Sequence, residues 1–167
     1  MQEYLITHDE VSTLAREVSQ HLERQKIETY IREAENIEVR KALGDDLFIA
    51  IKQNPEQYTL LLEGGTYESC GGLHMFQGLK TALAYYSYAR IIKNGDNHVT
   101  RFGFVQKEDE YSRKPESKDR VIAYNDAMSV ANSYMKECLD YLVATKTPLY
   151  KGEGIKSNVV QFRIIGE

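Results

Sequence analysis

The sequence predicts a mainly α-helical protein, a compact bundle of about five helices. Two observations carry this prediction. Apolar residues recur at helical spacing through most of the 167-residue chain, and one extended stretch, residues 98–112, separates the two longest helical patterns. The chain is long enough to bury a core as one domain. We therefore expect a helical bundle with an extended arm or hairpin between its last two long helices, followed by a strand-prone C-terminal tail.

The first predicted helix begins after Thr7, because Thr7 and Glu10 match the capping-box pattern. We expect it to end near His21 or Leu22. The second ends at Gly44, a residue that suits the left-handed conformation after a helix. Its apolar face contains Ile27, Tyr30, Ile31, Ala34, Ile37 and Ala42.

The third helix is expected to begin at Asp45 and Asp46, since carboxylates favour a helix N-terminus. Asn54-Pro55 should end it. Residues 57–62 predict one or two further helical turns, which end at Gly64-Gly65. The small residues of 66–72 are interpreted as a flexible link.

The fourth helix is predicted over residues 73–93 and the fifth over 118–145. The fourth is apolar over so much of its surface that we expect it to be buried on more than one side. Between them, residues 96–117 form a predicted contact arm, because a lone extended segment needs a partner strand. Its apolar residues are the candidate contacts Phe102, Phe104, Val105 and Tyr111.

The chain divides into a helical domain, residues 1–147, which includes the arm, and an extended tail, residues 148–167. The tail ends in a strand-prone run, which can pair with another chain by strand addition. Its candidate contact residues are Val159, Val160, Phe162, Ile164 and Ile165.

Composition excludes several function classes. A net charge of −4 argues against a dedicated nucleic-acid binder, which needs clustered Lys and Arg. Cys70 and Cys138 lack metal-ligand spacing and fit a reducing compartment without disulfides. Residues 1–9 lack a signal pattern, and no apolar run approaches the ~18 residues of a membrane span. We expect the protein to be made in cytoplasm or to assemble there.

The sequence predicts no catalytic, cofactor or metal site. Its four histidines contain no pair at i, i+4 for a metal. Cys138 lies on an apolar helix face and is expected to be buried. A catalytic Cys70, a phosphate loop at the glycine pairs, a metal at the acidic clusters and base stacking on Tyr85, Tyr86 and Tyr88 remain alternatives. We expect the protein not to be an enzyme.

Two segments resemble the small head-to-tail connector proteins of tailed phages, especially crAss-like and other phages of Bacteroidales. One is Ile31-Arg-Glu-Ala-Glu-Asn-Ile-Glu-Val-Arg-Lys-Ala-Leu-Gly-Asp-Asp-Leu-Phe48, with a helix ending in Leu-Gly before an acidic pair and an aromatic. The other joins Leu83-Ala-Tyr-Tyr-Ser-Tyr-Ala-Arg90 to Val99-Thr-Arg-Phe-Gly103 and a long helix. Phe102 stands where a small polar residue is more usual in that family. The resemblance covers residues 5–145.

This resemblance implies a structural virion protein without cofactors. Adaptor or head-completion proteins of this kind form a homo-oligomeric ring, commonly of about twelve copies, under the portal. The ring contacts the portal and other connector or tail proteins, and it extends the DNA channel, without specific DNA binding, for genome ejection. We therefore expect a location at the head-to-tail junction after assembly in the host cytoplasm. The alternative is a helical scaffolding or regulatory module that binds a single protein partner, and a small enzyme or nucleic-acid-binding module is the third hypothesis.

Overall fold

The computed structural model describes residues 4–19, 22–94, 97–100, 103–106 and 117–152. The predicted fold class is confirmed, because the protein is a mainly helical bundle. The elements of the first half are α1 (His8–Leu14), α2 (Arg24–Ala34), the π-helix η1 (Glu35–Val39), α3 (Arg40–Leu43), α4 (Asp45–Gln53), the 3₁₀-helix η2 (Pro55–Tyr58) and α5 (Thr59–Glu63). The elements of the second half are β1 (Gly65–Ser69), β2 (Gly72–Phe76), α6 (Leu79–Asn94), β3 (Asn97–Thr100), β4 (Gly103–Gln106) and α7 (Ser117–Ala144).

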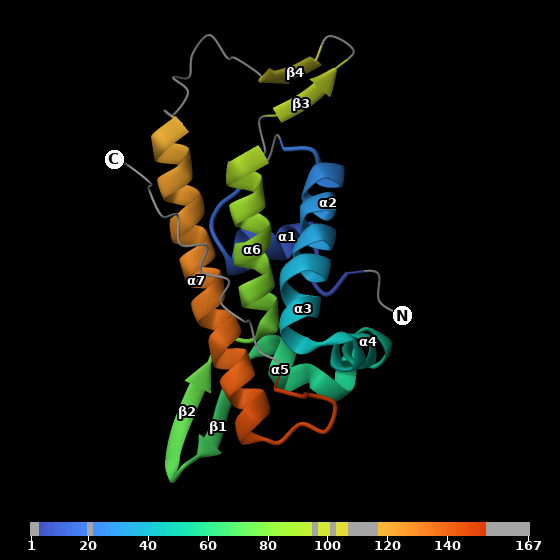
Figure 1. Ribbon diagram of the computed structural model, residues 1–167, viewed down its shortest axis with the longest axis vertical. Helices are drawn as coiled ribbons and strands as arrows, with labels where there is room; N and C mark the ends of the chain where they lie inside the picture. The colour runs from blue at the N-terminus through green and yellow to red at the C-terminus, as the bar shows by residue number, and fades with distance from the viewer. Residues whose placement is uncertain (1–3, 20–21, 95–96, 101–102, 107–116, 153–167) are drawn as a thin grey trace, which may run out of the picture.

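Helix α6 is the centre of the bundle. It lies between α7 on one side and α2 and α3 on the other (Figure 1), and it also contacts α1 and α5. Its buried residues are Leu79, Ala82, Leu83, Ala84, Tyr86, Ser87 and Ala89. Because these residues point in several directions around the helix, the prediction that it is buried on more than one side is confirmed.

The continuous helix from α2 to α3 contains a π-turn that changes its buried face. Ala34 is fully buried, and the next buried aliphatic position is Val39 rather than Ile37. Ile37 is 53% exposed, so its predicted core position is wrong. A π-helix takes one more residue per hydrogen-bonded turn than an α-helix, and this shift moves the inward position along the chain.

Most of the helix ends follow the sequence signals. Thr7 caps α1 with both hydrogen bonds of the capping box, and Gly44, at φ +82°, separates α3 from α4. Helix α1 is shorter than predicted, because it ends at Leu14. The chain then turns so that Arg16 pairs with Asp126 of α7, at 2.7 Å.

The largest difference from the sequence-based prediction is at residues 65–78. The expected flexible link and the first turns of the expected fourth helix instead form an antiparallel hairpin of β1 and β2, and α6 begins at Leu79. Cys70 and Gly71 connect the paired residues Ser69 and Gly72, and both have positive φ, +51° and +77°. A two-residue hairpin turn of type I′ requires positive φ at both central positions.

Two glycines hold the base of this hairpin. A Cβ on Gly78 would lie 2.4 Å from the Gly64 nitrogen, and one on Gly64 would lie 2.6 Å from the Gln77 carbonyl carbon. Both glycines also have positive φ, +83° for Gly64 and +85° for Gly78. The chain therefore enters and leaves the hairpin through a backbone contact that only glycine permits.

A second antiparallel hairpin, β3–β4, lies within the arm predicted between the two long helices. Its register pairs Asn97 with Gln106 and Thr100 with Gly103. It lies beyond one end of α6, whereas β1–β2 lies beside the opposite end of α7 (Figure 1). The strand-prone part of the tail lies outside the described residues.

The glycine contact leads to a stability prediction. We expect Gly78→Ala to lower the free energy of unfolding by about 3 kcal/mol or more, because left-handed strain of about 1–2 kcal/mol adds to an overlap with backbone atoms. Gly44→Ala is the matched control, since Gly44 has φ +82° but nothing within 4 Å of the added Cβ. Urea unfolding measures both variants, and an equal loss in the two would contradict the close contact.

Candidate protein interface

The β1–β2 hairpin is attached to α7 through an aromatic cluster on one of its faces. Phe76 stacks on Tyr141 with ring centroids 4.7 Å apart, and Tyr67 contacts both rings edge-on at 5.7 and 5.3 Å. At the end of the hairpin, the Gln77 N–H donates to the Glu137 carboxylate at 3.3 Å. These contacts fix the direction in which the hairpin leaves the bundle.

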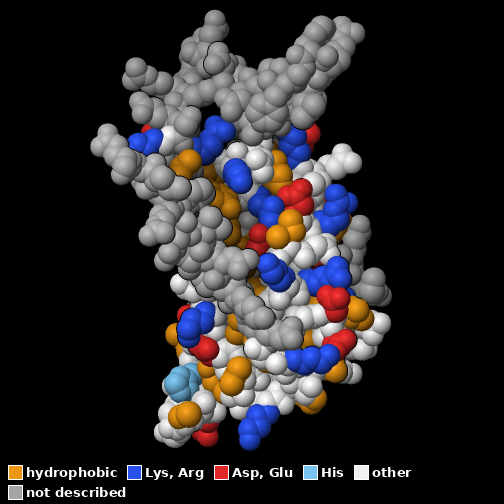
Figure 2. All heavy atoms as spheres, viewed as in Figure 1, with side chains coloured by type: hydrophobic (Ala, Val, Ile, Leu, Met, Phe, Trp, Pro, Cys, Tyr) orange, Lys and Arg blue, Asp and Glu red, His pale blue; other side chains and the backbone are white. Residues whose placement is uncertain are grey.

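The opposite face of the hairpin presents two apolar side chains to solvent. Leu73 and Met75 are each 71% exposed, the highest value among the large hydrophobic residues in the described part of the chain. They lie across from Glu68 and Thr66 in the register, and alternate residues of a strand share a face. Figure 2 shows hydrophobic side chains at the lower left, over the hairpin. An exposed apolar face on an ordered projection is typical of an interaction site.

The edges of the hairpin are also available. The sheet has only two strands, so in the described part of the chain each strand has one edge without a neighbouring strand. Residues 72–75 of β2 are all exposed, whereas β1 alternates between half-buried and exposed residues. Unpaired N–H and C=O groups on such an edge can accept a further strand.

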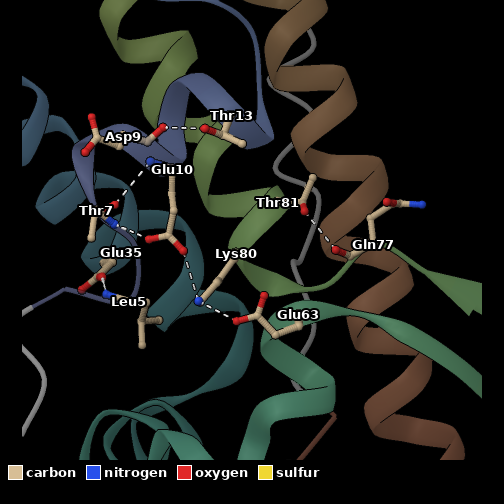
Figure 3. Close-up of polar contacts among 10 residues, drawn as sticks. All are labelled: Leu5, Thr7, Asp9, Glu10, Thr13, Glu35, Glu63, Gln77, Lys80 and Thr81. Carbon is tan, nitrogen blue, oxygen red and sulfur yellow. Dashed lines mark hydrogen bonds and ion pairs between the residues drawn. The ribbon is translucent and has the colours of Figure 1, made fainter.

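A polar cluster fixes the base of the hairpin to the rest of the bundle (Figure 3). The Lys80 ammonium, in the first turn of α6, contacts Glu63 of α5 at 2.6 Å and Glu10 of α1 at 3.2 Å. Burial of Lys80 disfavours its charge, but hydrogen bonds to Glu63 and Glu10 outweigh this effect and raise its pKa. Lys80 thus ties three helices together beside the two ends of the hairpin.

A hollow lies between the N-terminal segment, α2 and α4. It has a volume of about 370 Å³ and is bounded by Tyr4, Arg32, Phe48 and Ile49, with a buried ion pair in its wall. Lys52 Nζ lies 2.7 Å from Glu35 Oε2, and Glu35 Oε1 accepts a hydrogen bond from the Leu5 N–H. The carboxylate is therefore paired through both oxygens, which favours a structural role.

The described residues contain few side chains that could act in catalysis or bind a metal. The Cys138 thiol is fully buried, as predicted, and burial raises its pKa to about 12, so it stays protonated at neutral pH. Cys70 is exposed at the hairpin turn.

Within residues 4–19, 22–94, 97–100, 103–106 and 117–152, no group of three His, Cys, Asp or Glu residues is placed to hold a metal. In the same residues, no helix is both long and apolar enough to cross a membrane.

Two of the nine candidate contact residues from the sequence lie within the described residues. Phe104 and Val105 lie in β4, opposite Val99 and His98. Seven others lie outside the described residues, and they are Phe102, Tyr111, Val159, Val160, Phe162, Ile164 and Ile165. The residues that sequence reasoning missed are Leu73 and Met75, which were assigned to a buried helix. The signal that could have identified them is the glycine spacing, because Gly64-Gly65, Gly71-Gly72 and Gly78 bound two runs of five residues, 66–70 and 73–77.

Fold and surface together define a helical bundle that projects an ordered, partly apolar hairpin. Residues 39–157, more than two thirds of the chain, match the model of a family of unknown function, DUF6712. The chain belongs to this family. Neither the curated proteins nor the solved structures include a match to it.

The buried ion pair gives a second stability prediction. Lys52→Met should lower the free energy of unfolding by about 3–5 kcal/mol, because it leaves the Glu35 carboxylate, 3% exposed, without its counter-ion. The double variant Glu35→Gln/Lys52→Met should recover much of this loss, because the neutral amide oxygen can still accept from the Leu5 N–H. The control is Lys136→Met, which breaks a solvent-exposed pair with Asp140 and should not shift the urea midpoint. A double variant no more stable than Lys52→Met would contradict the interpretation.

Proposed function

We propose that this protein is a structural virion protein, the subunit of a connector ring that joins the portal to the tail of a tailed phage. The observation that carries the proposal is the position of two hairpins at opposite ends of one long helical body (Figure 1). The α7 helix alone has 28 residues and spans about 42 Å. A subunit placed between two other rings needs a contact surface at each end.

The nature of these surfaces supports the proposal. The β1–β2 hairpin carries two exposed apolar residues, and the arm that contains β3–β4 carries Phe104 and Val105 in its sequence. Among the described residues the core comes mainly from the helices, and the β1–β2 hairpin contributes Phe76 to it, with Tyr67 packed alongside. Apolar side chains that are exposed in the single chain can be buried when copies assemble, and this burial favours the assembled state.

The ring would consist of identical copies in a closed, heterologous arrangement, in which one surface of each copy meets a different surface of the next. Its partners would be the portal protein on one side and other connector or tail proteins on the other. DNA would pass through the central channel without specific binding, which agrees with the net charge of −4. The protein would be assembled in the host cytoplasm and located at the head-to-tail junction.

The resemblance of residues 31–48 and 83–103 to phage connector proteins supports the same function. The alternative is a helical module that binds a single protein partner through the same surfaces. These two functions differ in stoichiometry, because a ring requires many copies and a binding module requires one.

Light scattering tests the proposed function. The full chain is mixed with the portal protein encoded beside it, and the mass of the complex is measured. We expect about twelve copies to load onto each portal ring. Deleting residues 153–167 should weaken loading, whereas Lys41→Glu, an exposed change on α3, should not. Failure of the full chain to bind the portal would overturn the connector function, and binding of one copy would favour the single-partner module.

A further inference from the structure

The β1–β2 hairpin has the features of a receptor for an added strand. Its outer face presents Leu73 and Met75, two residues apart, and the β2 edge is exposed along residues 72–75. A two-stranded hairpin is marginal in water, and a third strand would extend its hydrogen bonding and its apolar face. The aromatic contacts with Tyr141 and the glycine contact at its base hold this hairpin in place before any strand is added.

The tail of the chain has the matching pattern. Val160, Phe162 and Ile164 alternate with other residues, so in an extended segment they would share one face. Their spacing equals that of Leu73 and Met75, and paired strands place such residues side by side. A strand formed by residues 159–165 therefore suits the β2 edge.

The described chain ends beside α4, and the tail begins there. Lys151 Nζ pairs with Asp46 Oδ2 of α4 at 2.6 Å, so the chain lies against α4 just before the tail. In Figure 1, α4 and the β1–β2 hairpin lie on opposite sides of α5. From Gly152, the seven residues to Val159 extend by at most about 25 Å. In the proposed ring, we take the β2 edge that residues 159–165 meet to be that of an adjacent copy, and the test below separates this from the edge of the same chain.

We propose that residues 159–165 of one copy add as a strand to the β2 edge of the adjacent copy, beside Leu73 and Met75. Each copy then donates a strand on one side and receives one on the other. Such a head-to-tail contact repeats from copy to copy and closes into a ring when the rotation permits. This inference rests on the proposed ring and names the contact within it.

Cysteine cross-linking of the full chain tests this contact. One chain carries Leu73→Cys and the other Ile164→Cys, both with Cys70→Ser, so that Met75 and Phe162 remain in place. Under mild oxidation the mixture should form the mixed disulfide about tenfold faster than a control mixture in which Lys41→Cys replaces Leu73→Cys, because pairing raises the effective thiol concentration. Adding Met75→Lys to the first chain should reduce the rate to that of the control.

The outcomes separate this inference from the proposed function. Equal rates for the Leu73→Cys and Lys41→Cys mixtures, with or without portal, would overturn the strand contact even if the portal still loads a ring. A chain carrying both Leu73→Cys and Ile164→Cys that closes only on itself would also overturn it, because the tail would then occupy its own hairpin. Fast mixed cross-linking without portal loading would support the contact and reject the connector function.

Discussion

The backbone contact between Gly64 and Gly78 is the constraint on which the rest of the structure depends. It joins the end of α5 to the start of α6 and leaves residues 65–76 outside the helical body as a hairpin. Lys80, two residues after Gly78, reinforces this junction, because its ammonium pairs with both Glu10 and Glu63. The contact thus separates Leu73 and Met75 from α6, and the hairpin register leaves both side chains exposed.

The helical body supplies a rigid support for these projections. Helix α6 is surrounded by other helices, and the Tyr86 hydroxyl donates to Asn132 of α7 at 2.7 Å within their contact. On the far side, Arg90 pairs with Glu33 and Glu38, which joins the end of α6 to α2 and the π-helix. Ion pairs thus join α6 to α1 and α5 near its start, and to α2 and the π-helix near its end.

Sequence reasoning predicted the class of fold, the capped start of α1, the Gly44 and Asn54-Pro55 boundaries and the two long helices. These features depend on local signals that act within a few residues. The hairpin could not be predicted with the same rules, because Leu73 and Phe76 continue the helical spacing of Leu79 and Leu83. The tertiary contact between Gly64 and Gly78 separates them, and the glycines around the two strands are its only mark in the sequence. The exposure of Ile37 likewise follows from a π-turn, which has no clear signal in sequence. Of the nine candidate contacts, Phe104 and Val105 lie in a strand of the predicted arm, and as contacts all nine stay predictions.

The central claim is that the hairpin is an assembly surface within a ring, and hydrogen exchange measures this most directly. Amide exchange of the full chain is followed before and after loading onto the portal. The account predicts that residues 72–76 and 159–165 gain protection together on assembly, because strand pairing satisfies their backbone groups at the same moment. Unchanged exchange of both segments in a loaded ring would contradict the account, since the copies would then associate through other surfaces.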